Sequence, residues 1–338
     1  MKNKLAVRLG MVFLLVVAIS AAVIYFTFDI KALKYIHMFK VDCLALAFGS
    51  LAIGLLFDGI RLMTLTSITG EKLPLKHVAN VVLSNYFLAL VTPGASGGAI
   101  AQIMFMRKAG IPVAKSTVVV LVRTMFSIIF LMLLVPFALH LDPDIAKWMS
   151  PAIITVVSMI FTALPIVAMI LMHTDYPEKW IYLCTKRFSS STQRKSLMWY
   201  YEFKKSAFVI AKSPFKVFRA FIESGLSLLF IYGCVPAYFS GVDFDFDVVQ
   251  VMGRMVLLNL VLYFSPTPGG SGVAEAGFVF LFSKILPEGL AGIMAVMWRF
   301  TAEYVPFLIG GCFCVRAFGA DVLNLLSHKK ERKLEENK

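Results

Sequence analysis

Apolar residues run along this chain in long stretches that are separated by short polar segments. Six stretches are long enough to cross about 30 Å of hydrocarbon as helices that rise 1.5 Å per residue. They cover residues 7–28, 41–65, 113–139, 150–173, 217–240 and 288–316. The first run exceeds a signal-peptide core in length, so we expect it to remain as a transmembrane helix. The pattern predicts an all-α polytopic membrane protein.

Two further apolar stretches are interrupted by nearly the same six residues. "TPGASG" occupies Thr92–Gly97 and "TPGGSG" occupies Thr267–Gly272, with five of six positions identical. The run before the first motif, Val78–Val91, supplies only about 21 Å of helix. Short apolar runs follow both motifs, at 99–106 and 273–282. Because proline removes a hydrogen-bond donor and glycine accepts left-handed backbone, each motif is expected to end one helix before another begins.

The distribution of charge distinguishes two topologies for these interrupted segments, which either cross the membrane as discontinuous helices or return as re-entrant hairpins. Ten Lys and Arg residues lie in 176–219 against two acids, and further basic residues lie near the N-terminus, at 107–115 and in the tail. Hairpins place all of these on the cytoplasmic side, as the positive-inside tendency requires, whereas crossings separate them. Only the loop 29–42 fits poorly. We therefore expect six spanning helices plus two re-entrant helical hairpins arranged as an inverted repeat, in the cell (plasma or inner) membrane, with both termini cytoplasmic.

This arrangement gives a single transmembrane domain over 1–320 and a basic cytoplasmic tail over 321–338. Its inverted halves cover about 41–139 and 217–316, and a basic cytoplasmic or interfacial segment at 176–216 joins them. Within that segment, apolar residues recur at three- and four-residue steps: Leu197, Tyr200, Phe203, Ala207 and Ile210. This spacing predicts an amphipathic helix on the inner leaflet, and a plain charged connector is the alternative.

Polar residues repeat with the motifs. Asn85 precedes the first motif proline by eight residues and Asn259 precedes the second by nine. Arg123 and Arg299 follow those prolines by thirty and thirty-one residues, each inside an apolar helix. Broken helices that meet near the membrane midplane in inverted repeats are a recurrent transporter architecture.

Composition supports this class of protein and limits its chemistry. Hydrophobic residues make up 59% of the 338 residues and charged residues 16%. A soluble domain of this length could not bury so much apolar surface. The net charge of +13 is concentrated in the loops described above, which favours anionic lipid headgroups over nucleic acid. The five cysteines form no CxxC pair, and no P-loop, HExxH or GxSxG motif occurs. We expect no enzyme activity, no cofactor and no metal site.

The two motifs carry the candidate ligand chemistry. We expect Ser96 and Ser271 to cap the helices that follow them, and free amides at the tips to favour an anion such as a phosphate. The alternative is that TPGxSG is only a tight turn that packs between helices. The candidate substrate-binding residues are Thr92, Pro93, Gly94, Ser96, Gly97, Arg123, Thr267, Pro268, Gly269, Ser271, Gly272, Glu275, Arg299 and Glu303.

Ionisable residues inside apolar helices are expensive, so they are functional candidates. Arg123 and Arg299 suit a lipid phosphate, but Arg299 and Glu303 also have the spacing of a structural ion pair. Glu275 has no counterpart in the first repeat, where Ile100 occupies the matching position. Its carboxylate could bind a cationic headgroup, carry a coupling proton or complement the N-terminus of a helix. Asp58 and Arg61 have the spacing of a local structural pair.

The segments "TPGASGG" and "SPTPGGSGVAEAGF", in a chain of hydrophobic inverted halves, resemble the flippase-like transmembrane domain of lysylphosphatidylglycerol synthases, the multiple peptide resistance factor proteins. The resemblance covers roughly residues 5–320. It implies movement of aminoacylated phosphatidylglycerol between leaflets, with Thr267–Gly272 and Glu275 in a central headgroup cavity and Thr92–Gly97 opposite. Fused members continue into an aminoacyltransferase domain. This chain ends about twenty residues after its last apolar stretch, so we expect a stand-alone member without lysyl transfer.

The leading functional hypothesis is a lipid flippase or transporter that moves a phospholipid or lipid-linked headgroup through a cavity between the two hairpin tips. Two alternatives stay open: a transporter of small solutes or anions, and a non-transporting membrane partner of a separate lipid synthase. The expected partners are membrane lipids, namely anionic or aminoacylated phospholipids or polyprenyl and glycolipids, and no nucleic acid. A homo-oligomer and a separate lipid-modifying enzyme also stay open as partners.

Overall fold

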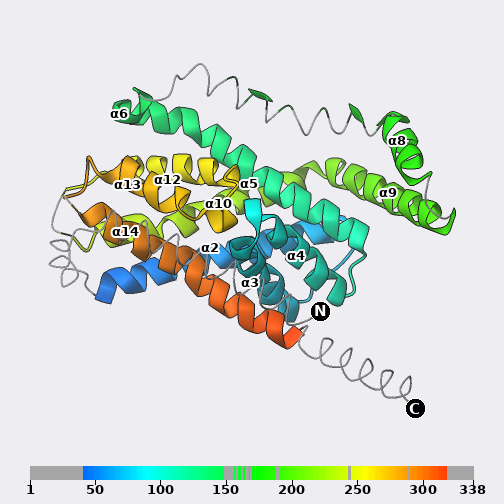
Figure 1. Cartoon of the computed structure of the whole chain (residues 1–338), viewed down its shortest axis with the longest axis horizontal. Helices are drawn as coiled ribbons and strands as arrows, with labels where there is room; N and C mark the ends of the chain where they lie inside the picture. Colours follow the sequence, from blue (N-terminus) through cyan, green and yellow to red (C-terminus); the bar gives the residue numbers. More distant parts are fainter. Residues whose placement is uncertain are drawn as a thin grey trace, which may run out of the picture.

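The computed structural model describes residues 41–147, 174–186, 190–242, 245–287 and 289–317, with isolated positions between 156 and 173. All regular elements in these ranges are helical (Figure 1). In chain order they are α2 (Val41–Ile68), α3 (Leu75–Val91), η2 (Pro93–Ala95), α4 (Ser96–Lys108), α5 (Val113–Leu141), α6 (Pro143–Ala146), α8 (Tyr176–Thr185), α9 (Ser190–Ala211), α10 (Pro214–Tyr232), α11 (Cys234–Phe239), α12 (Val248–Tyr263), η3 (Pro268–Gly270), α13 (Val273–Phe282), α14 (Leu290–Arg299) and η4 (Phe300–Tyr304). The all-α prediction is confirmed for the described part of the chain.

Three helical segments within these ranges are long and apolar enough to cross a membrane: α2, α5 and the continuous pair α10–α11. Their bounds agree with the predicted spans to within three residues. A further helical run covers 290–317 and contains the π-helical segment η4. The predicted span 7–28 lies outside the described residues, and of 150–173 only isolated positions are described.

Each TPGxSG motif separates two short helices. In the first motif Gly94 and Ala95 have φ of 60° and 52°, and in the second Gly269 and Gly270 have φ of 56° and 68°. Two successive left-handed residues cannot continue a right-handed helix, so they keep α3 and α12, which end at Val91 and Tyr263, separate from the helices that follow. Ala95 is the only described non-glycine residue with positive φ, which marks a strained backbone at this tip.

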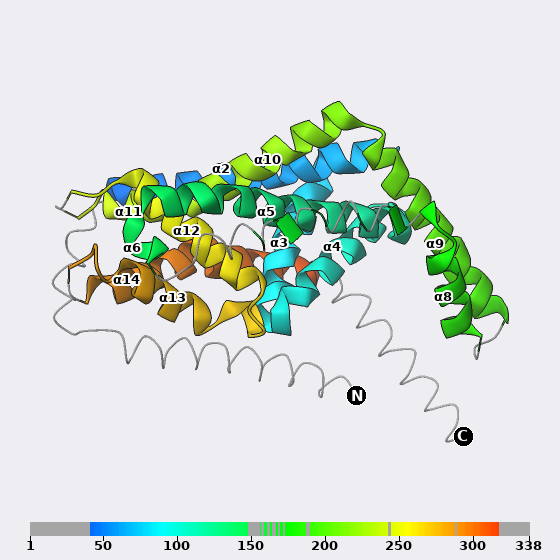
Figure 2. The same ribbon diagram turned by 90° about the horizontal axis from the view of Figure 1, so that it is seen from above.

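The same order of elements occurs twice: a long helix, a short helix, a 3-10 break, a short helix and a long helical run. The first set is α2, α3, η2, α4 and α5, and the second is α10–α11, α12, η3, α13 and 290–317. Figure 2 shows α3–α4 near the middle of the molecule and α12–α13 beside it, on the side away from α8 and α9, and the two breaks η2 and η3 contact each other.

Small residues let helices of the two sets approach closely. A Cβ atom added to Gly54 of α2 would lie 2.6 Å from Cγ1 of Ile231 in α10. Gly310 lies against the backbone of Leu83 in α3. Small residues at helix interfaces are the usual route to tight packing where lipid removes the hydrophobic driving force. Helices of the first set therefore pack directly on helices of the second set, and together they form one helical body.

The amphipathic helix predicted in 176–216 is present as α9. Tyr200 and Ile210 are buried, and Phe203 and Ala207 pack on a cluster that includes Leu62. The apolar face thus packs largely on protein, mainly on α5, and its contact with an inner leaflet stays a prediction. The helix α8 packs beside α9 and leaves its aromatic residues exposed.

Candidate functional site

The two motifs lie against each other at the centre of the molecule. A Cβ atom added to Gly269 would lie 2.6 Å from Cδ1 of Leu90, the penultimate residue of α3. The same addition at Gly94 would meet only the carbonyl oxygen of Ser265, at 4.0 Å. Glycine at 269 is therefore required both by the backbone angle and by the close approach of the other tip.

The first tip is held together by its threonine. Thr92 Oγ1 donates to the carbonyl of Leu88 at 2.7 Å and accepts from the amide of Gly97 at 2.8 Å. The prediction that Ser96 caps the second helix is wrong, because Ser96 is the first residue of α4 and follows the left-handed Ala95. The hydroxyl of Thr92 reaches across the turn and satisfies the amide of Gly97 in the first turn of α4 instead.

The second tip is held by an ion-pair network. The carboxylate of Glu275 accepts from the amide of Gly272 at 2.8 Å and from Nε of Arg299 at 3.2 Å. Arg299 also donates to the carbonyl of Gly269 at 2.9 Å, to Ser271 Oγ at 3.4 Å and to Glu303. Arg299 thus connects the tip to the helical run 290–317.

These contacts correct the second capping prediction. Gly272, not Ser271, is the N-cap of α13, and the side chain of Glu275 satisfies its amide. Of the three roles considered for Glu275, the structure contains the contact with a helix N-terminus. The amides of Gly97 and Gly272 both donate to side chains, and the binding of an anion by the other tip amides stays a prediction.

A second buried ion cluster lies between α2 and α5. Asp58 and Arg61 form the expected local pair, and Arg123 Nε donates to the same carboxylate at 2.9 Å. The second guanidinium nitrogen of Arg123, Nη2, also contacts Asp58, so the pair is bidentate. Arg61 Nη1 donates to Ser127 Oγ at 2.9 Å. Two guanidinium groups therefore share one carboxylate.

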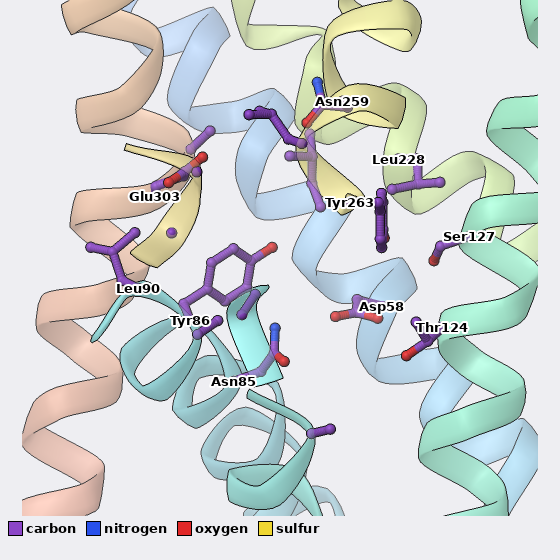
Figure 3. Close-up of a pocket in the computed structure, with 18 of the residues that line it drawn as sticks. Asp58, Asn85, Tyr86, Leu90, Thr124, Ser127, Leu228, Asn259, Tyr263 and Glu303 are labelled. Atoms are coloured by element: carbon purple, nitrogen blue, oxygen red, sulfur yellow. The ribbon is translucent and has the colours of Figure 1, made fainter. Parts of the chain in front are cut away.

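A cavity of about 390 Å³ lies where the tips and the ion clusters come together. Figure 3 shows Glu303 on one side of it, Asp58, Thr124 and Ser127 on the other, and Tyr86 between them. Its polar lining comes from both repeats: Asp58, Arg61, Asn85, Tyr86, Ser96, Gln102, Arg123, Thr124, Ser127, Ser227, Tyr232, Asn259, Tyr263, Ser265, Thr267 and Glu303. Apolar residues such as Leu90, Leu228 and Trp298 complete the wall. A mainly apolar wall with convergent polar groups is typical of ligand sites of this volume.

The predicted site residues divide into two groups. Those that line the cavity are Gly94, Ser96, Arg123, Thr267, Gly269 and Glu303. Those that shape the tips or pair with lining residues without lining it themselves are Thr92, Gly97, Pro268, Ser271, Gly272, Glu275 and Arg299. Pro93 begins η2 at the first tip. The ion pair between Arg299 and Glu303 is present, and Glu303 keeps 19% of its side chain exposed beside the cavity.

Sequence reasoning missed much of the polar lining. Asp58 and Arg61 were assigned to a local pair, although their place in an apolar helix was a signal for function. Asn85 and Asn259 were noticed only as repeated positions, and both line the cavity. Gln102 had no distinguishing signal in the sequence. Among the described residues, no group of three His, Cys, Asp or Glu side chains is placed to hold a metal ion.

A helical body with membrane-length apolar helices, two broken hairpins and a charged cavity between them defines a polytopic membrane protein with an internal polar site. Residues 13–310 match the family described as the lysylphosphatidylglycerol synthase TM region, and the chain belongs to this family. A UPF0104 membrane protein of Archaeoglobus fulgidus is 19% identical over 260 residues, which cover 74% of this chain and 79% of that protein. The resemblance inferred from the two motifs is thus confirmed.

Proposed function

We propose that this protein is a lipid flippase or transporter, which moves the headgroup of a phospholipid or lipid-linked molecule between leaflets while the acyl tails stay in lipid. The observation that carries the proposal is the cavity of about 390 Å³ with ionised side chains, Arg123 and Glu303, at the junction of two broken hairpins. Charged groups inside an apolar helical body are costly even when they are paired, which makes a role with a ligand or a path the default hypothesis.

The arrangement of the hairpins supports alternating access. Hairpins that enter from opposite faces of the membrane would place their tips, and this cavity, near its midplane. In our proposal the halves 41–139 and 217–316 form an inverted repeat within the single domain 1–320, with both termini and the segment 176–216 in the cytoplasm. Rocking of one half against the other, or opening of one tip, would expose the cavity to each leaflet in turn.

The family supports a role with lipids. Its description names the transmembrane region of a lipid synthase, and the described part of this chain presents no group of side chains that we assign to catalysis. We therefore propose transport, not group transfer, as the activity, with membrane lipid as the partner. A separate lipid-modifying enzyme would supply or consume that lipid.

The test is transport by purified protein in vesicles. Phospholipids that carry a fluorophore on one acyl chain are incorporated in both leaflets, and a membrane-impermeant reductant removes the outer fluorescence. Transport predicts that fluorescence falls well below the half that protein-free vesicles retain. Vesicles that keep half their fluorescence for phospholipid, polyprenyl lipid and glycolipid alike would contradict the proposal. Uptake of a soluble anion by the same vesicles would instead support a solute transporter.

A further inference from the structure

Two charged side chains retain exposure in the cavity, and their charges are opposite. Arg123 keeps 12% of its side chain exposed and Glu303 keeps 19%. Their partners are almost fully enclosed, since Asp58 and Arg299 are each 1% exposed. A ligand in the cavity therefore meets one cationic and one anionic group.

The formal charge on each wall follows from the ion clusters. Asp58 with Arg61 and Arg123 sums to +1, and Arg299 with Glu275 and Glu303 sums to −1. Figure 3 shows Asp58 and Glu303 on opposite sides of the cavity. The remaining titratable side chains of the lining are tyrosines. In a site of low dielectric constant, these separated charges act strongly on a ligand.

Unpaired polar atoms provide a second, independent sign of a ligand. Gln102 is 1% exposed and lines the cavity, yet neither atom of its amide has a partner among the described residues. Nε of Arg61, in the cationic cluster, is likewise buried without one. Buried polar groups are almost always hydrogen-bonded, so such atoms in a cavity wall mark a place for a polar ligand or for water that a ligand would displace.

We propose that the cavity selects a headgroup with one phosphate and one primary amine, which is neutral overall. The phosphate faces Arg123, with Gln102 and Arg61 as further hydrogen-bond donors, and the ammonium faces Glu303. An anionic headgroup leaves the net negative charge of the cluster of Arg299, Glu275 and Glu303 unbalanced, and a headgroup with two amines brings one cation too many. This inference rests on the proposed function and specifies its substrate class.

The experiment compares lipids with identical acyl chains and the same tail fluorophore, moved by the wild-type protein in vesicles. The headgroups are phosphoethanolamine, N-acetylphosphoethanolamine, phosphoglycerol and lysyl-phosphoglycerol. We expect phosphoethanolamine lipid to move about tenfold faster than the N-acetyl form, the ratio that corresponds to one favourable charge contact of about 1.4 kcal/mol. Equal or faster movement of the phosphoglycerol or lysyl lipid overturns the inference and leaves the proposed function intact. Movement of none of the four overturns the inference, and the proposed function is contradicted as well only if polyprenyl lipid and glycolipid also fail to move.

A soluble arm separates a lipid headgroup from a free phosphoamine. The same vesicles are offered radiolabelled phosphoethanolamine in solution. Its accumulation without lipid movement would show that the charge pattern serves a solute and would overturn the lipid assignment. No accumulation, together with selective lipid movement, supports the inference.

A matched pair of variants tests the assigned anion. Glu303→Gln keeps the size and an acceptor for Arg299, and we expect it to abolish the preference for phosphoethanolamine over its N-acetyl form. Glu71→Gln changes a carboxylate that pairs with Lys115, outside the cavity lining and outside both ion clusters. It should leave that preference ratio unchanged. A Glu303→Gln protein that keeps the wild-type ratio overturns the inference. If this variant does not fold, the comparison of the four headgroups with the wild-type protein still tests the inference.

Discussion

Gly94 and Gly269 occupy the same place in the two TPGxSG motifs and adopt nearly the same left-handed backbone, but only Gly269 is packed against the opposite tip. Their φ angles are 60° and 56°. A Cβ atom at 269 would lie 2.6 Å from Leu90, whereas at 94 its nearest neighbour would be 4.0 Å away. Substitutions at the two positions can therefore distinguish the cost of a left-handed backbone, which both share, from the cost of crowding at the contact between the tips, which only position 269 has.

Gly269→Ala should therefore destabilise the protein more than Gly94→Ala. Both variants place alanine in a left-handed conformation, which costs about 1–2 kcal/mol. Only the first also overpacks the junction, for about 1–3 kcal/mol more. The free energy of unfolding in detergent micelles measures the difference. Equal losses would mean that the tips do not touch.

Asp58→Asn should be strongly destabilising, because it leaves Arg61 and Arg123 buried without a full counter-charge. Breaking a buried ion pair typically costs about 3–5 kcal/mol. Thermal unfolding of the purified variant measures this loss. The matched control is Asp144→Asn, which breaks an exposed pair with Lys147 and should not change unfolding measurably. A stable Asp58→Asn protein would contradict the role of this carboxylate.

Gln102→Leu should separate stability from activity. The variant removes two buried polar atoms that lack partners, so the free energy of unfolding should stay the same or rise by about 1 kcal/mol. Lipid movement should fall about tenfold if the amide contacts the headgroup. Ser116→Ala, a buried change that removes a hydroxyl which donates to the carbonyl of Pro112, serves as control and should leave the rate unchanged. Unaltered transport by Gln102→Leu would argue against a ligand contact.

Glu275→Gln should weaken the second tip. The carboxylate accepts from Gly272 and Arg299, and loss of its charge should reduce the free energy of unfolding by about 1–3 kcal/mol. Transport per folded molecule should be largely kept. A selective loss of transport in a fully stable protein would instead place Glu275 in direct contact with the ligand.

The contact between α8 and α9 should weaken in acid. Glu178 accepts from Tyr201 Oη at 2.9 Å and from Lys204 Nζ at 3.2 Å, and these bonds lower its pKa below the ordinary 4.5. A lowered pKa in the folded state means that the stabilisation is present above pH 4.5 and is lost as the pH falls through the lower value. The protection factors of the α8 amides, which correct for the pH dependence of intrinsic exchange, should fall only below that range. Glu178→Gln should give low protection factors at every pH, while Glu202→Gln should behave as wild type.

The motif residues show how far local sequence could predict the site. Proline and glycine made the helix breaks predictable, because their backbone preferences act within a few residues. The caps were not predictable, since Thr92 and Glu275 each reach across a turn whose shape depends on left-handed residues. Gln102 could not be identified because nothing local distinguishes a cavity-lining amide from a surface one.

Composition, helical period and motif were enough to assign the class of this protein, with its apolar runs, its two broken helices and its family. Which charges meet depends instead on how the helices pack. Packing joined Arg123 to Asp58 across 65 residues and Arg299 to Glu275 across 24, and placed Glu303 opposite the first cluster. The physical reason is that helix formation depends on neighbouring residues, whereas a buried charge depends on the partners that packing brings to it.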